Sequence, residues 1–471
     1  MLARVSGKLD PVAVARTIVE LAATLGNRLV TSSGVREEHS NRKSWIAGEP
    51  PDAVIFPQST EDVQRIVQIC SGYRVPIIPY GAGTSFEGHV NAPFGGVSID
   101  LRDMNGILAV HSDDLDCVIE PGVTRTQLND HLRDRGLFFP VDPAATATLG
   151  GMAATRASGT NTVRYGTMKE NVIALKAVLA NGEVIQTSRR AKKSAAGYDL
   201  TRLLIGSEGT LGIITELTLR LSVIPEAIAA GICPFPSIEA ACNAAILTIQ
   251  SAIPIARIEL LDALQVKACN LYSKLALPET PILFVEFHGT DACVAEQSAR
   301  FGEIASDLGG GPFEWATNLE DRTRLSMARQ DAYWAACALR AGTHAIASDV
   351  CVPISRLAEC IAATQQDIET SGLLAPIVGH VGDGNFHLML IVDMRDADEV
   401  TRATKLLERL IERALAMDGT CTGEHGVGEG KMKYLLSEHG PGALDAMRAI
   451  KLALDPLNIM NPGKIFQMSE A

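Results

Sequence analysis

The sequence Pro79-Tyr-Gly-Ala-Gly-Thr-Ser-Phe-Glu-Gly88 follows a short apolar run of the kind found in buried strands. Its glycines allow successive backbone N–H groups to turn toward one point, which makes a nest for a pyrophosphate. The stretch is not a Rossmann fingerprint, because no glycine lies three residues after Gly83, and it lacks the Gly-Lys-Ser/Thr ending of a P-loop. Alone, such a loop is more often an ordinary tight turn, so its interpretation depends on the rest of the chain.

Further runs of small residues lie downstream of this loop. Asp142-Pro143 leads to Thr148-Leu-Gly-Gly-Met-Ala-Ala154, and Ser158-Gly159 and Arg164-Tyr-Gly166 continue the pattern. Another run is Gly206-Ser-Glu-Gly-Thr-Leu-Gly-Ile-Ile214. Small residues let the backbone approach a flat ligand closely. Several such runs at strand ends favour one large, extended cofactor over a set of unrelated turns.

A second pattern is His380-Val-Gly-Asp-Gly-Asn-Phe-His387, which predicts a β-hairpin with Asp383-Gly384 as a two-residue turn. That register pairs His380 with His387, with Cβ atoms about 5 Å apart, and places Asn385 on the same face. A single strand histidine usually packs in the core or faces solvent. An opposed pair, followed later by Glu424-His425, instead favours a divalent metal site with an open position.

Composition narrows the class of protein. A chain of 471 residues with 46% hydrophobic and 21% charged residues is typical of a soluble globular protein of two or three domains. A net charge of −13 argues against nucleic acid as a partner. The ten cysteines form no Cys-x-x-Cys, which excludes a ferredoxin-type cluster and fits reduced thiols. No apolar run approaches the ~20 residues of a membrane span and no signal peptide is evident, so we expect a cytoplasmic protein without an integral membrane segment.

The spacing of apolar runs predicts an α+β protein. Short strands and glycines from Asp52 to Leu221 predict a domain of two small α+β subdomains, and composition shifts near Val223-Ile-Pro225. Beyond it, alternating strands and helices predict an antiparallel sheet covered on one side by helices. The predicted domain limits are 1–222, 223–425 and 426–471. Expected strands are Ala227–Cys233, Ala256–Leu261, Ile282–His288, Ala345–Val352 and the hairpin Pro376–Val392, and expected helices are Ile238–Ser251, Ala292–Leu308, Leu319–Ala341, Ile354–Thr370 and Ala397–Met417.

Together these motifs resemble a known family. Gly81–Gly88, Glu120-Pro-Gly-Val123, Gly150–Gly159, Arg164-Tyr-Gly-Thr167 and Gly206–Ile214 are similar to the FAD-binding motifs of the vanillyl-alcohol-oxidase superfamily, which has the PCMH-type FAD-binding fold. From His39 to Ile465 the chain resembles the branch of D-lactate dehydrogenase (cytochrome) and the glycolate oxidase catalytic subunit. D-2-hydroxyglutarate dehydrogenase is a close relative of that branch.

The resemblance implies a non-covalent FAD, because no histidine lies beside Gly83 where some relatives tether the flavin; His89 is the alternative that stays open. It also implies that the tail around Asn461 returns to the flavin domain. The residues implied in FAD binding are Pro79, Gly81, Ala82, Gly83, Thr84, Ser85, Gly88, Pro121, Pro143, Thr148, Leu149, Gly150, Ala153, Ala154, Ser158, Gly159, Tyr165, Gly212, Ile214 and Asn461.

The resemblance also assigns the catalytic residues. It implies that His380, His387 and Glu424 bind a divalent cation (Zn, Mn or Fe) and that His425 is the base for the substrate hydroxyl. Arg329, within Ser326–Trp334, would bind the substrate carboxylate; from the residues alone, a surface salt bridge is the simpler interpretation of Arg329. Asn385, on the histidine face, is expected to hydrogen-bond the same carboxylate.

The implied reaction is oxidation of a small D-2-hydroxy acid, foremost D-lactate to pyruvate, by hydride transfer to flavin N5. Electrons would pass to a separate acceptor: a cytochrome, a quinone or an electron-transfer protein. Ile346-Ala-Ser-Asp-Val-Cys351 lacks the lysine of hydroxyglutarate enzymes, which disfavours a dicarboxylate substrate. Open alternatives are a dehydrogenase or oxidase for glycolate or another D-2-hydroxy acid, D-2-hydroxyglutarate included, and a catalytic subunit of a larger electron-transfer complex. A homodimer, and peripheral attachment to a membrane through the acceptor, also stay open.

Overall fold

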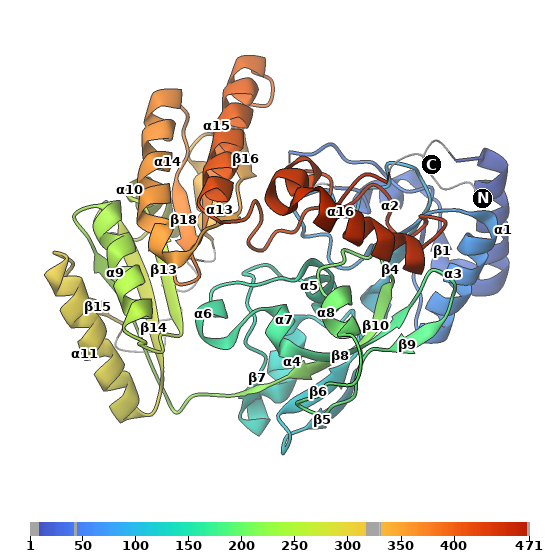
Figure 1. Ribbon diagram of the computed structural model, residues 1–471, viewed down its shortest axis with the longest axis horizontal. Helices are drawn as coiled ribbons and strands as arrows, with labels where there is room; N and C mark the ends of the chain where they lie inside the picture. Colours follow the sequence, from blue (N-terminus) through green and yellow to red (C-terminus); the bar gives the residue numbers. More distant parts are fainter. Residues whose placement is uncertain (1–8, 42–44, 317–328, 330, 469–471) are drawn as a thin grey trace. The chain divides into compact units, whose positions relative to one another are not determined.

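The computed structural model describes residues 9–41, 45–316, 329 and 331–468, and its chain forms two compact units (Figure 1). Unit 1 contains Met1–Ser158, Gly166–Ile224 and Glu424–Ala471, and unit 2 contains Gly159–Tyr165 and Pro225–Gly423. The chain therefore leaves unit 1 and returns to it. The domain limits predicted at 222/223 and 425/426 stay a prediction about independent folding units.

The first half of unit 1 is a mixed sheet with helices packed on it. Its strands are β1 (Leu29–Val30), β2 (Ala53–Ile55), β3 (Ile77–Tyr80) and β4 (Val97–Asp100), in the order β1-β2-β4-β3. Strands β2 and β3 run parallel to β4. The accompanying helices are α1 (Pro11–Leu25), α2 (Ser33–Glu38) and α3 (Thr60–Tyr73). Because β3 ends at Tyr80, this parallel strand delivers the glycine-rich loop to the edge of the sheet.

The second half of unit 1 is an antiparallel sheet in the order β5-β6-β10-β8-β9. The elements here are β5 (Ile107–His111), β6 (Asp116–Ile119), α4 (Arg125–Leu132), β7 (Leu137–Phe138), α5 (Leu149–Thr155), α7 (Met168–Asn171), β8 (Val172–Val178), β9 (Val184–Gln186), α8 (Leu200–Leu204), β10 (Ile213–Arg220) and β11 (Ser222–Val223). Its core includes Leu128, Phe139, Leu149 and Leu217, all without exposed surface.

The C-terminal segment belongs to unit 1. After helix α16 (Leu435–Leu454), Met460 forms a parallel bridge with Ile77, and Ile459 and Met460 are fully buried in the core around α3 and β3. The buried Lys451 ammonium donates to the carbonyls of Thr210 (2.7 Å) and Met460 (2.8 Å). These bonds hold the tail beside the loop that follows β3.

Unit 2 is built on an eight-stranded antiparallel sheet in the order β15-β12-β14-β13-β18-β19-β16, with β17 paired to β19. The elements are α6 (Thr162–Tyr165), β12 (Ala227–Pro234), α9 (Ile238–Gln250), β13 (Arg257–Leu261), α10 (Ala263–Ser273), β14 (Ile282–Gly289), α11 (Asp291–Asp307), β15 (Glu314–Trp315), α13 (Ala332–Ala338), β16 (His344–Ala347), β17 (Val350–Cys351), α14 (Leu357–Ser371), β18 (Ile377–His380), β19 (Asn385–Val392) and α15 (Ala397–Ala416). The α+β prediction with an antiparallel sheet in the second half is confirmed. The expectation that helices cover only one side of this sheet was wrong, because α10 and α13 pack on the face opposite to α9 and α11.

Alternation of side chains gives this sheet two different faces. Phe284, Leu261 and Val378 share one face and pack with α10 and α13 in a single apolar cluster. Phe287, of opposite parity on β14, packs against Phe301 of α11, with ring centroids 5.9 Å apart. Helix α11 packs with α9, and α9 with α14, so the main helical layer covers this second face. The α10/α13 face is called the polar face below, because it also carries the histidines.

The predicted register of the histidine hairpin was wrong. In the structure His380 pairs with Asn385, and Val378 pairs with His387. The connection is a four-residue turn, Val381–Gly384, in which Asp383 N–H donates to the His380 carbonyl at 3.0 Å. The predicted two-residue loop shifted the pairing by two residues. Because strand side chains alternate with period two, both histidines and Asn385 still share the polar face.

Two predicted elements differ in other ways. The strand expected at Ala345–Val352 is divided into β16 and β17 by Ser348-Asp349, although pairing with β19 resumes in the same register. The helix expected at Leu319–Ala341 falls largely outside the described residues, which include its α13 part and Arg329. Helix α10 was not expected, because its apolar pattern is weak.

Two further expectations, on membrane-spanning segments and on cysteines, can be compared with the described residues. Within them, no helix is long and apolar enough to cross a lipid bilayer. All ten cysteines belong to the described part of the chain, and none forms a disulfide.

Asp262 caps helix α10 and gives the fold a pH dependence. Burial raises the pKa of this carboxyl to about 7. The backbone N–H of Gln265, which donates to the carboxyl at 2.7 Å, lowers the pKa but does not outweigh burial. In the unfolded chain the group titrates near its ordinary value of about 4. The folded state therefore binds more protons between these values, and this contribution to stability falls as pH rises from about 4 to about 7.

We predict that Asp262→Asn removes this decline, because asparagine keeps the capping oxygen and does not ionise. The urea midpoint of the variant, relative to wild type, should be higher at pH 8 than at pH 5. Asp262→Ala, which also loses the cap, should be destabilised by about 1 kcal/mol at acidic pH. An unchanged difference between Asn variant and wild type at the two pH values would contradict the assignment.

Candidate functional site

A cavity in unit 1 collects most of the predicted cofactor residues. It lies where the loop after β3 meets helix α5 and the C-terminal tail. The predicted residues that line it are Pro79, Gly81, Ala82, Gly83, Thr84, Ser85, Pro143, Thr148, Ala154, Ser158 and Asn461. Four of them offer hydroxyl groups and most are small, so the wall combines hydrogen-bond donors with close access to backbone. This arrangement fits the pyrophosphate and ring system of FAD.

The loop after β3 requires glycine for steric reasons. Gly83 has φ +62°, a region that side chains rarely adopt, and an added Cβ would overlap the hydroxyl of Tyr80. At Gly81 an added Cβ would overlap the Thr148 hydroxyl at the start of α5. Both glycines are therefore needed for the close packing that shapes this wall of the cavity.

The other predicted cofactor residues are not part of the cavity wall within the described chain. Gly150 packs against Pro121, whose carbonyl accepts from its N–H at 2.9 Å. Leu149, Ala153 and Ile214 are buried in the core of unit 1, and Gly212 packs against the Val178 carbonyl. Gly88, with φ +77°, packs near Glu429. Gly159 and Tyr165 belong to unit 2, where the Tyr165 hydroxyl lies 2.7 Å from His288 Nδ1.

The cavity also contains a buried ion pair that the sequence reasoning missed. His89 Nε2 lies 3.3 Å from Glu208 Oε1, and both side chains are almost fully buried. Burial raises the pKa of the Glu208 carboxyl, but His89 and the backbone N–H groups of Val427 and Gly428 outweigh it and lower the pKa. Glu208 lies inside the Gly206–Ile214 run, so a charged residue within a glycine-rich motif was the available signal.

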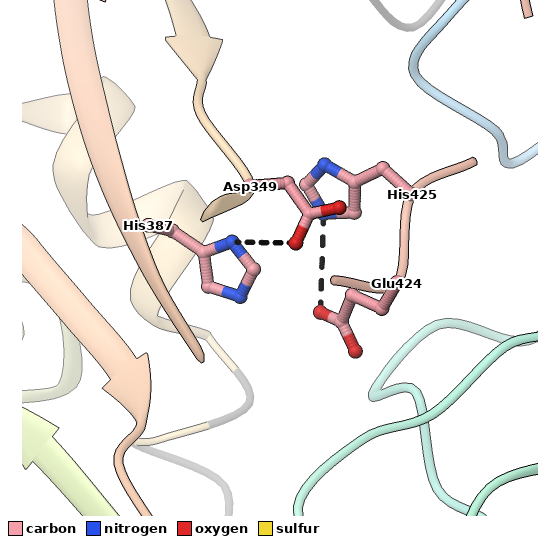
Figure 2. A group of neighbouring side chains, drawn as sticks. All are labelled: Asp349, His387, Glu424 and His425. Carbon is pink, nitrogen blue, oxygen red and sulfur yellow. Dashed lines mark ion pairs between the residues drawn. The ribbon is translucent and has the colours of Figure 1, made fainter. Parts of the chain in front are cut away.

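Glu424 and His425 line the same cavity. Glu424 accepts a hydrogen bond from the Ser158 hydroxyl at 2.7 Å, so Ser158 serves the carboxylate as well as the cavity wall. The His425 ring packs on Phe86, with centroids 5.0 Å apart. Figure 2 shows the two side chains from one loop, with His425 Nε2 3.9 Å from Glu424 Oε1. The predicted base therefore lies in the wall of the predicted flavin cavity.

In unit 2 the two histidines of the hairpin converge, with ring centroids 5.5 Å apart. His387 Nδ1 lies 2.9 Å from the Ser348 carbonyl, and His380 Nδ1 lies 2.7 Å from Glu259 Oε1. A carbonyl and an ionised carboxylate only accept, so both Nδ1 atoms must donate. In the neutral state each ring then carries its lone pair on Nε2, the form that binds a metal.

Asp349 is a carboxylate beside His387 that the sequence reasoning missed. Its Oδ1 lies 3.9 Å from His387 Nδ1 (Figure 2). Asn385 donates to Asp349 Oδ1 (3.0 Å) and to the Val350 carbonyl (2.8 Å). Both amide N–H groups of Asn385 are thus engaged by protein acceptors, and only its carbonyl oxygen remains. A donated bond from Asn385 to a substrate carboxylate, as the sequence suggested, conflicts with this arrangement.

Arg329 lies on the polar face and is not a surface residue. Its side chain is buried, and Nη2 lies 2.5 Å from Glu259 Oε2. The simpler interpretation, a surface salt bridge, was wrong, because the partner is a fully buried strand residue. Of its predicted helix, Leu319–Ala341, residues 319–328 and 330 lie outside the described residues.

The chain itself links the two groups of residues. Thr420 forms a bridge with Cys351, the Thr422 hydroxyl donates to Asp349 Oδ2 at 2.8 Å, and Gly423 N–H donates to the Asp349 carbonyl at 3.1 Å. Glu424 follows Gly423 directly, one Cα step of about 3.8 Å along the chain. The loop that is bonded to Asp349 therefore continues straight into Glu424 and His425.

The sequence was compared with families and with individual known proteins. The family model described as FAD linked oxidases, C-terminal domain, matches residues 224–465, and the FAD binding domain model matches residues 51–188. The chain is 50% identical to a probable mitochondrial D-lactate dehydrogenase of Danio rerio, covering 97% of this chain and 93% of that one. It is 47% identical to a mitochondrial D-lactate dehydrogenase [cytochrome] of Arabidopsis thaliana, covering 95% and 79%.

Among solved structures, 4-ethylphenol oxidase from Gulosibacter chungangensis has the same fold, with a TM-score of 0.82, 19% identity and 98% coverage of both chains. The predicted PCMH-type FAD-binding fold is thereby confirmed.

The steric limit at Gly83 gives a test of the cavity. We predict that Gly83→Ala loses most of its FAD, because the positive φ costs an L-residue about 1–2 kcal/mol and the methyl group displaces Tyr80. The ratio of flavin to protein absorbance after gel filtration measures this loss. Gly72→Ala in α3, where an added Cβ meets nothing within 4 Å, is the control and should retain FAD. Full FAD content in Gly83→Ala would contradict the prediction.

Proposed function

Because the chain belongs to the FAD-linked oxidase family, in the D-lactate dehydrogenase (cytochrome) and glycolate oxidase branch of FAD-dependent oxidoreductases, we propose that it oxidises D-lactate to pyruvate with the help of a divalent cation. The observation that carries the proposal is the pair of buried histidines, each with Nδ1 against an acceptor oxygen, on the face that also holds Arg329.

FAD fits the cavity of unit 1. The glycines of the loop after β3 and the hydroxyls of Thr84, Ser85 and Thr148 suit its pyrophosphate. When bound, FAD supplies the acceptor for the hydride from C2 of the substrate. Non-covalent attachment and the individual FAD contacts remain part of the proposal.

We propose that His380, His387 and Glu424 hold the cation. Two imidazoles and one carboxylate are a ligand set used for Zn, Mn and Fe, and three protein ligands leave a position for substrate. The cation supplies Lewis-acid polarisation of the substrate hydroxyl. Asp349, which Asn385 and Thr422 hold in place, is a further carboxylate at His387.

Residues of the chain itself bind the substrate carboxylate and remove the hydroxyl proton. Arg329 binds the substrate carboxylate through a charge-assisted pair, and His425 removes the hydroxyl proton. Asn385 orients Asp349, because its donors are engaged there. The segment 346–351 carries no lysine for a second carboxylate, which favours a monocarboxylate over D-2-hydroxyglutarate.

The electron acceptor is proposed to be a separate partner of the cytochrome type, because relatives are named as cytochrome-linked D-lactate dehydrogenases. A quinone or an electron-transfer protein is the alternative. The cytoplasmic location and the homodimer stay predictions.

The substrate and the cation are tested together. Turnover with a dye acceptor over a panel of D- and L-2-hydroxy acids should be highest for D-lactate and low for L-lactate and D-2-hydroxyglutarate. Dialysis against a chelator should abolish turnover while FAD remains bound, and added Mn²⁺ or Zn²⁺ should restore it. Full turnover in metal-depleted protein would exclude the proposed Lewis-acid role.

The base is tested by His425→Ala. The variant should keep FAD and metal but lose about 10²- to 10⁴-fold in kcat, the usual contribution of a positioned base. His131→Ala, an exposed histidine of the same unit, is the control and should leave kcat unchanged. Near-normal kcat in His425→Ala would refute the assignment.

A further inference from the structure

Glu259 is a charged residue in the middle of the sheet of unit 2. It lies on β13 with 1% of its surface exposed, and its neighbours on that strand, Ile258 and Leu260, are core residues. An ionised carboxylate in such a position is strongly unfavourable unless both oxygens are paired. The energetic cost of a glutamate at this position therefore calls for a specific explanation.

Both oxygens of Glu259 are engaged by residues of the proposed site. Oε1 accepts from His380 Nδ1 at 2.7 Å, and Oε2 lies 2.5 Å from Arg329 Nη2. Both partners are themselves buried, so Glu259 meets them away from solvent. One carboxylate thus joins a proposed metal ligand to the proposed substrate-binding arginine.

The bond to His380 determines its tautomer. Because the carboxylate holds the proton on Nδ1, the lone pair of the neutral ring lies on Nε2, aimed away from Glu259. A carboxylate behind a ligating histidine also fixes the ring's orientation and raises its basicity.

The ion pair with Glu259 holds one end of the guanidinium, Nη2, beside the carboxylate. Within the described residues, Arg329 Nε is buried and has no hydrogen-bond acceptor, although the side chain is only 7% exposed. A buried donor without an acceptor is costly, and a bound carboxylate would satisfy it. Glu259 therefore leaves one edge of the guanidinium available for an anion.

We propose that Glu259 is a positioning residue that serves both halves of the reaction, orienting His380 toward the cation and Arg329 toward the substrate carboxylate. This inference rests on the proposed function. It goes beyond it by assigning metal affinity and substrate affinity to one buried carboxylate that touches neither ligand.

The test is Glu259→Gln in the full-length holoenzyme. Glutamine has the same shape but accepts through one oxygen and carries no charge. We expect Co²⁺ affinity, measured by chelator competition, to fall about 10- to 100-fold, with a changed Co²⁺ absorption spectrum. The KM for D-lactate should rise by a larger factor than kcat falls, and FAD content should stay unchanged, because the FAD cavity lies in unit 1.

Glu399→Gln is the matched control. Glu399 is also a buried glutamate of unit 2 in an ion pair with an arginine, Arg340, at 2.6 Å. It contacts no residue of the proposed site, so its loss should lower thermal stability without changing Co²⁺ affinity or KM. If Glu259→Gln behaves like this control, Glu259 is a structural ion pair and the inference is wrong.

Two measurements on wild type and variant distinguish failure of the proposed function from failure of the inference about Glu259. If wild type binds no Co²⁺ and needs no cation, the metal part of the proposed function fails, and the His380 half of the inference fails with it. If wild type binds Co²⁺ and Glu259→Gln binds it equally with unchanged KM, only the inference fails. Should the glutamine variant not fold, Glu259→Asp keeps the charge on a shorter side chain, and unchanged Co²⁺ affinity together with unchanged KM in that variant would also overturn the proposal.

Discussion

The alternation of side chains across an antiparallel sheet controls the chemistry of unit 2. On β13, β18 and β19, residues of one parity form the polar face, and these include Glu259, His380, Asn385 and His387. Residues of the other parity are apolar and pack under the main helical layer. A shift of one residue in the pairing of any of these strands would move its apolar side chains to the polar face and its polar side chains under the helical layer. The folding energy of the core therefore also fixes the direction of the polar side chains.

This polar face is stable only because its buried groups satisfy one another. Among the described residues, His387 Nδ1 lies against the Ser348 carbonyl and Asn385 donates to Asp349. Glu259 accepts from His380 and forms an ion pair with Arg329. Such bonds orient the groups. On both histidines they place the proton on Nδ1, and among the described residues the buried Nε of Arg329 has no acceptor.

Sequence patterns predicted those features that depend on local chemistry. Glycine runs identified the cavity of unit 1, because close approach and positive φ restrict the choice of residue, as at Gly83. The histidine hairpin was identified with the wrong pairing. Because the predicted register differs from the observed one by two residues, the histidines still share one face of the sheet. The broken strand at Ser348-Asp349 was read as continuous, because β-type residues flank it.

Glu259 and Asp349 could not be found in the same way. Each is a single acidic residue in or beside a strand, and such residues usually face solvent. Their roles arise from partners far away in sequence, Arg329 and His380 for Glu259 and Asn385 for Asp349. Several residues implied in FAD binding, such as Leu149 and Gly150, instead pack beneath the cavity wall. A motif indicates the region of the fold in which a ligand binds. Whether each of its residues contacts the ligand depends on the direction in which that residue faces.

If Glu259 orients both partners, cation binding and substrate binding become linked. A cation on His380 makes its Nδ1–H more acidic and strengthens the bond to Glu259. The carboxylate then shares its charge less with Arg329, whose guanidinium gains capacity for the substrate carboxylate. Such coupling is reciprocal, since a factor by which one ligand improves the affinity for the other applies in both directions. A buried carboxylate between an arginine and a histidine is expensive as a source of stability alone. Its position becomes understandable when the same charge lets the site bind its cation and its substrate together.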